Sequence, residues 1–127
     1  MKLINNFFHI VHIDHREDEI EVTLRLNAEH TIFHAHFPGK PIMPGVCQVA
    51  MLVEALEALE GKDMELTAAK NIKFLNVISP ESVTDVEAVF SRINRSEDGL
   101  SFSAVMRSGD TVFSKLSLTC HYTHADE

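Results

Sequence analysis

The chain has 127 residues, of which 45% are hydrophobic and 24% are charged, and its formal net charge is −8. This length and composition predict one globular domain over residues 1–127, with a core over about 7–123, that needs no disulfide to fold. The negative charge argues against binding to a nucleic acid or to an anionic membrane surface.

The cellular compartment follows from the cysteines and from the N-terminal residues. Cys47 and Cys120 lie far apart in the sequence, which favours a reducing compartment over a disulfide framework. Asn5 and Asn6 interrupt the apolar N-terminal residues, so we expect no secretory signal. No apolar run approaches the roughly 18 residues of a membrane span. We therefore expect a cytoplasmic protein.

The pattern of apolar residues predicts strands around one long helix. Residues 7–13 are apolar and histidine-rich and suit a strand or a short helix. Residues 20–26 alternate apolar and polar side chains, the period of a half-buried strand. Residues 45–60 form a helix, with Pro44 near its first turn and Gly61 at its end. Further strands are expected at these positions: 68–76, 85–90, 101–106 and 112–122.

The expected helix is apolar on most of its sides, with Glu57 and Glu60 as a narrow charged stripe. Such a helix must be enclosed, so we expect an α+β fold in which a curved antiparallel sheet covers it on one side. The other side of the helix then needs a partner.

The segment from His36 to Val46 contains three prolines, two glycines and one histidine. Proline fixes φ and removes N–H donors, while glycine opens conformations that other residues avoid. The segment therefore predicts a rigid, irregular turn that holds His36 at the start of the helix. A histidine that faces the N-terminus of a helix suits a catalytic base beside an anion-stabilising group.

The segment His36–Val46 resembles the signature of the hot-dog-fold 3-hydroxyacyl-acyl carrier protein dehydratases, and residues 70–80 resemble the next strand and turn of that family. The resemblance implies a homodimer whose two sheets join edge to edge. Each of two interfacial sites would take His36 from one chain and a carboxylate from the helix of the other. The substrate would be a 3-hydroxyacyl thioester on acyl carrier protein or coenzyme A, with no metal and no organic cofactor.

The resemblance also assigns roles to other residues of the site. Gly45 corresponds to the position that polarises the thioester carbonyl, and Gly39 shapes the turn. Val46, Met51 and Phe74 are assigned to an acyl tunnel. A basic patch for an acidic carrier protein could be formed by Lys40, Lys70, Lys73, Arg92 and Arg95.

The chain departs from the family at position 50, where the family carries its acid and this sequence has Ala50. Glu54 follows four residues later, and residues i and i+4 of a helix share a face. Its helix neighbours are small or weakly polar, an environment that would favour a protonated carboxyl. We expect Glu54 to replace the missing acid, with Ala50 making room for its longer reach.

Two other functions and two other chemistries are compatible with these residues. A hot-dog thioesterase would use Glu54 to act on water, and a catalytically incomplete acyl-binding subunit would complement a complete homologue. His34 and His36 alternate as metal ligands can, but no third ligand is apparent. Cys47 lies near the helix N-terminus, where thiols are activated, but has no basic partner other than His36.

Overall fold

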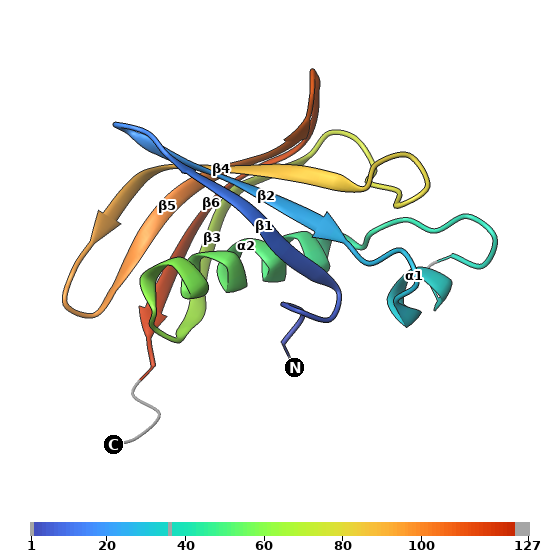
Figure 1. Ribbon diagram of the computed structural model, residues 1–127. Coiled ribbons are helices and arrows are strands. Elements are labelled where there is room, and N and C mark those ends of the chain that lie inside the picture. Colours follow the sequence, from blue (N-terminus) through green and yellow to red (C-terminus); the bar gives the residue numbers. More distant parts are fainter. Residues whose placement is uncertain (1, 36, 124–127) are drawn as a thin grey trace.

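One antiparallel sheet and two helices make up the part of the chain that the computed structural model describes, residues 2–35 and 37–123 (Figure 1). The sheet order is β1-β2-β4-β5-β6-β3, which leaves β1 and β3 at the edges. The elements are β1 (Phe8–His15), β2 (Glu19–Leu26), α1 (Thr31–Ala35), α2 (Gly45–Glu60), β3 (Met64–Phe74), β4 (Asp85–Arg95), β5 (Gly99–Ser108) and β6 (Thr111–Tyr122).

The α+β architecture expected from the sequence is confirmed, and so is the helix over residues 45–60. The strand over 20–26 is present, and the segment 7–13 lies mostly in a strand. Three strands differ most from the prediction. Strand β3 begins at Met64 and ends at Phe74 instead of 76, β4 continues to Arg95, and β5 extends over Gly99–Ser108. The short helix α1 was not expected.

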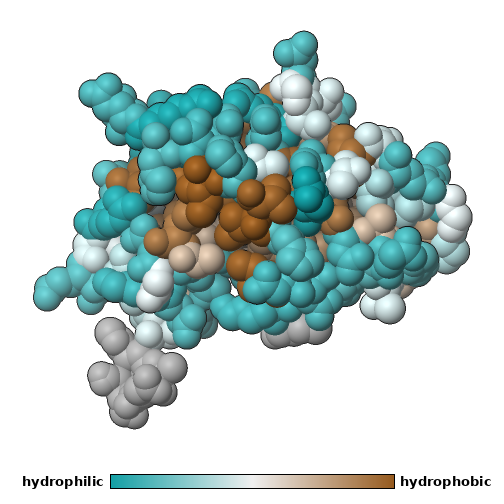
Figure 2. Space-filling view, in the orientation of Figure 1, coloured by the Kyte–Doolittle hydropathy of each residue, from teal (hydrophilic) through white to brown (hydrophobic). Residues whose placement is uncertain are grey.

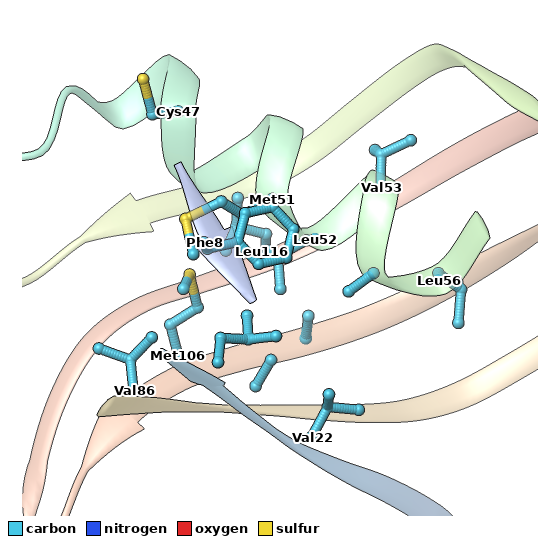
Figure 3. Packing of buried hydrophobic residues seen from close by; sticks show 14 of the residues in the cluster. Phe8, Val22, Cys47, Met51, Leu52, Val53, Leu56, Val86, Met106 and Leu116 are labelled. Carbon is cyan, nitrogen blue, oxygen red and sulfur yellow. The ribbon is translucent and has the colours of Figure 1, made fainter. Parts of the chain in front are cut away.

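Helix α2 lies against one face of the sheet and carries the centre of the core (Figure 1). Met51, Leu52 and Leu56 are fully buried and point from the helix toward the strands, while Cys47 and Val53 point away from them (Figure 3). The helix ends at Gly61, whose left-handed conformation allows its N–H to bond Glu57 O at 2.9 Å. Among the described residues, no helix is long and apolar enough to cross a membrane.

Two of the register shifts in the sheet, one in β3 and one in β4, contain a residue with positive φ. Asn71 has a φ of 52° and Arg92 a φ of 50°, and the register shifts at both places. A bulge bends its strand and increases the local twist. The two bulges therefore help the sheet to curve around α2.

Strand β3 is an edge that the rest of the chain leaves uncovered. After Met64, every residue of β3 is exposed. Large apolar side chains continue this exposure past the end of β3, since Phe74 and Leu75 are each 51% exposed and Val77 is 65% exposed. In the orientation of Figure 1, the molecular surface shows a hydrophobic patch near its middle, surrounded by hydrophilic residues (Figure 2). An unpaired edge beside exposed apolar side chains is typical of a surface that another chain covers.

The core can be tested with a matched pair of valines on neighbouring strands. Val22 of β2 is fully buried and Val11 of β1 is 40% exposed. We expect Val22→Ala to lower the free energy of unfolding by about 2 kcal/mol, because it removes buried methyl groups and leaves a cavity. Val11→Ala should change it by no more than about 0.5 kcal/mol. Urea denaturation of both variants measures the difference, and equal effects would contradict this description of the core.

Candidate active site

Backbone hydrogen bonds hold the turn that leads into α2. Phe37 and Lys40 bond each other's backbone, with N···O distances of 3.2 and 2.8 Å. Between them Gly39 has a φ of 77°, which glycine adopts without steric cost. Met43 N donates to Ile78 O at 2.8 Å, so the turn is also fixed to the segment after β3. An irregular, hydrogen-bonded turn is therefore present before α2, as the sequence predicted.

The start of α2 offers backbone donors. Pro44 is the N-cap residue and provides no side-chain cap. The N–H groups of Gly45 and Val46 have no acceptor inside the helix, and the helix dipole favours negative charge beside them. The Phe74 ring lies against Gly45, where a Cβ would be 2.7 Å from Phe74 Cζ. A side chain at position 45 would therefore have to displace the half-exposed Phe74 ring. The expected base, His36, lies outside the described residues.

In the described part of the chain, three hollows border this half of α2. One of them, about 480 Å³, lies between α1 and the start of α2 and is lined by Thr31, Ile32, Ala35, Pro44, Val46 and Cys47. The Gly45 groove, about 380 Å³, is lined by Met43, Gly45, Gln48, Phe74, Leu75, Asn76 and Val77. The Ala50 groove, about 420 Å³, is lined by Lys2, Val46, Val49, Ala50, Val53, Glu54, Glu57, Met64 and Leu66. Of the residues assigned to an acyl tunnel, Phe74 lines the Gly45 groove, and Val46 lines both the Ala50 groove and the hollow beside α1. Met51 instead lies fully buried in the core (Figure 3).

Glu54 is buried, with 7% of its surface exposed, and it lines the Ala50 groove. Its Oε1 atom accepts hydrogen bonds from Leu3 N and Ile4 N, both at 2.7 Å. The carboxylate thus holds the N-terminal segment against the helix. Only the other oxygen, Oε2, is left to face a substrate. The sequence indicated the shared face with Ala50 but not the two amide donors, because they lie about fifty residues away.

Glu57 is also buried, at 8% exposure, although the sequence pattern placed it on a charged stripe. Its Oε2 accepts a hydrogen bond from Met64 N at 2.7 Å, at the first residue of β3. Its Oε1 pairs with Lys2 Nζ, and this hydrogen bond raises the pKa of Lys2. Glu57 therefore joins the N-terminal segment, α2 and β3. Nothing in the local sequence distinguishes it from Glu60, which is partly buried and pairs with Arg95.

The cysteines are not activated thiols. Burial raises the pKa of Cys47, and burial together with the charge of Glu57 raises that of Cys120 to about 11. Nucleophilic cysteines need a lowered pKa. Within residues 2–35 and 37–123, no group of three or more His, Cys, Asp or Glu side chains is arranged to hold a metal ion.

Not all of the basic residues suggested for carrier binding are without an acidic partner. Arg95 forms two hydrogen bonds with Glu60, at 2.9 and 2.8 Å, which lower the pKa of that carboxyl. Lys70 and Arg92 line one polar hollow on the sheet, together with serine and threonine side chains. The patch is therefore smaller than the sequence suggested.

Comparisons with solved structures define the class of this protein as the hot-dog fold. A chain described as "The Dehydratase Heterocomplex ApeI:P from Xenorhabdus doucetiae" superimposes with a TM-score of 0.67 at 18% identity, covering 88% of this chain and 96% of that one. A thioesterase from Haemophilus influenzae gives 0.60 at 20% identity, covering 94% and 80%. At these identities the likeness shows the fold alone.

Sequence comparison gives the family. The family model described as "ApeI-like: ApeI dehydratase" matches residues 12–116, so the chain belongs to this family of dehydratases. A 3-hydroxyacyl-[acyl-carrier-protein] dehydratase FabZ from Levilactobacillus brevis is 35% identical over 109 residues, covering 74% of this chain and 73% of that protein. The FabZ of Lactiplantibacillus plantarum is 34% identical over 96 residues, and the match spans 65% of either chain.

The structural role of Glu57 can be tested by stability. We expect Glu57→Ala to lower the free energy of unfolding by about 1–3 kcal/mol, because Met64 N–H loses its acceptor in a buried place. Glu65 is an exposed neighbour on β3, so Glu65→Ala is the control and should change stability by less than about 0.5 kcal/mol. Chemical denaturation compares the two. A Glu57→Ala protein as stable as the control would show that the buried contacts are dispensable.

Proposed function

We propose that the chain dehydrates 3-hydroxyacyl thioesters, carried on acyl carrier protein or coenzyme A, to trans-2-enoyl thioesters. The reaction would serve fatty acid synthesis or a related specialised lipid or polyene pathway. The family match supports dehydration in general. The observation that carries the residue assignment is the position of Glu54, a buried carboxylate beside Ala50 in the same groove.

In the proposed reaction, His36 takes a proton from C2 of the acyl chain, and the electron pair of that C–H bond forms the C2=C3 double bond. The C3–O bond breaks, and the hydroxyl leaves as water with a proton from Oε2 of Glu54. The backbone N–H of Gly45 donates to the thioester oxygen as negative charge develops there. Gly39 keeps the turn in shape, while Val46 and Phe74 line the acyl path. Met51 lies in the core behind it.

We further propose that the site lies between two copies of the chain, so that Glu54 of one copy and His36 of the other act on the same substrate. The exposed residues of β3, together with Phe74, Leu75 and Val77, support a homodimer in which the two sheets meet at this edge. Such a contact would cover the apolar side chains and pair the free backbone groups.

Glu54→Gln provides the central test. The amide oxygen of glutamine still accepts from Leu3 N and Ile4 N, so the variant should fold, but it cannot donate an acidic proton. We expect the rate of water loss from a 3-hydroxyacyl thioester to fall about 10²- to 10⁴-fold, and a similar loss in His36→Ala. Mass analysis of the products measures the rate of water loss in each variant. Release of free acid by the wild-type chain would instead indicate a thioesterase.

A second candidate is a catalytically incomplete subunit that completes the site of a homologue. Two observations favour it: position 50 is Ala50, and Oε1 of Glu54 is already used by Leu3 and Ile4. The related chain from Xenorhabdus doucetiae is named as part of a heterocomplex. In this case the acid would come from the helix of a different chain.

Ala50→Glu separates the two candidates. If Glu54 is the acid, a second carboxylate beside it should not raise the rate of the isolated protein. If the chain is an incomplete subunit, the isolated wild type should be inactive, and Ala50→Glu should restore water loss that still depends on His36. The measurement is the single-turnover rate of each variant, with Glu54→Gln in the same series.

A further inference from the structure

Gln48 is a buried polar side chain in the first turns of α2. Only 3% of its surface is exposed, and its Oε1 atom has no hydrogen-bond partner within the described part of the chain. A buried amide without a partner costs stability, and most such groups in proteins are satisfied. Its presence therefore needs an explanation other than folding.

The side chain of Gln48 lines the Gly45 groove. The groove is mostly apolar, and its other polar side chain is the exposed Asn76, whose Nδ2 donates to Val112 O at 2.8 Å. Gln48 is thus the buried polar side chain of this groove. The helix N-terminus, with its uncapped N–H groups, lies one turn away at Gly45.

Gly45 and Gln48 lie on the same side of α2, because residues three apart are neighbours on a helix surface. A ligand that accepts a hydrogen bond from the N–H of Gly45 therefore brings its adjoining atoms toward the Gln48 side chain. In a 3-hydroxyacyl thioester the hydroxyl is two carbons from the carbonyl. A primary amide can both donate and accept, and so can a hydroxyl. Rotation about the last torsion of glutamine lets either atom of the amide face the groove.

We propose that the Gln48 amide binds the 3-hydroxyl group of the acyl chain, and so selects hydroxylated over plain acyl thioesters. This assignment rests on the proposed function, since it takes the thioester carbonyl to lie at Gly45. Gln48 transfers no proton. It binds the leaving group before the reaction, and a chain without the hydroxyl leaves the buried amide unpaired.

The test is a binding experiment with the full-length protein and two probes of equal chain length, a 3-hydroxyacyl and a plain acyl pantetheine. In both probes NH replaces the thioester sulfur, which makes the C2 proton less acidic and prevents turnover. We expect the wild-type protein to bind the hydroxylated probe about 10- to 100-fold more tightly by calorimetry. In Gln48→Met, whose side chain has a similar length, this ratio should fall to about one.

Ser114→Ala is the matched control. Ser114 is fully buried, its Oγ also lacks a partner among the described residues, and it does not line the Gly45 groove. This variant should keep the wild-type ratio. The melting temperature of Gln48→Met should not fall, because removing an unpaired polar group does not remove a hydrogen bond. A purely structural role for Gln48 would lower it.

Three results would overturn the inference: equal binding of the two probes by the wild type, an unchanged ratio in Gln48→Met, or binding of neither probe. Dehydration is measured separately on the true thioester. A wild-type protein that shows the Gln48-dependent preference but no water loss would refute the proposed function and leave this inference standing. A wild-type protein that removes water from the thioester but binds both probes equally would support the proposed function and refute this inference.

Discussion

Two buried carboxyl groups on a mostly apolar helix set the main constraint on this structure. A buried carboxyl group, whether neutral or charged, is tolerated only when it is paired or hydrogen-bonded. Glu54 meets this requirement through the backbone of Leu3 and Ile4, and Glu57 through Lys2 and the first amide of β3. The N-terminal segment, the central helix and the edge strand are therefore tied together by two side chains one turn apart.

This arrangement makes the helix both a scaffold and a functional surface. Its middle fills the core through Met51, Leu52 and Leu56, while its first turns remain open on the other sides. Backbone donors at Gly45, the amide of Gln48 and the carboxylate of Glu54 follow one another along it. A polar group on a helix keeps its position because packing on the opposite face fixes the backbone. The turn before the helix is fixed by the hydrogen bond from Met43 N to Ile78 O, and it holds the N-terminal end of the helix in position.

The sequence predicted the features that depend on local pattern. The limits of α2 followed from Pro44 and Gly61, and the alternation in 20–26 gave β2. Helix α1 was missed because five residues are too few to show a period. The contacts of Glu54 and the pairing of Glu57 with Lys2 were missed because these partners are distant in the chain. The contact of Glu57 with Met64, seven residues later, was missed because it depends on how the chain turns from α2 into β3. The sequence did not indicate a role for Gln48, because its missing hydrogen-bond partner can be recognised only from the positions of its neighbours in the structure.

The exposed edge of β3 bears on which other chain can pair with it. Backbone hydrogen bonds are the same for any sequence, so an open strand edge accepts an unrelated strand as readily as a related one. Selectivity must then come from the side chains that flank the edge, among them Leu66, Ile72 and Phe74, which are 38%, 37% and 51% exposed. In the proposed dimer, the shape of these side chains would decide whether the chain pairs with its own copy or with another protein of this fold.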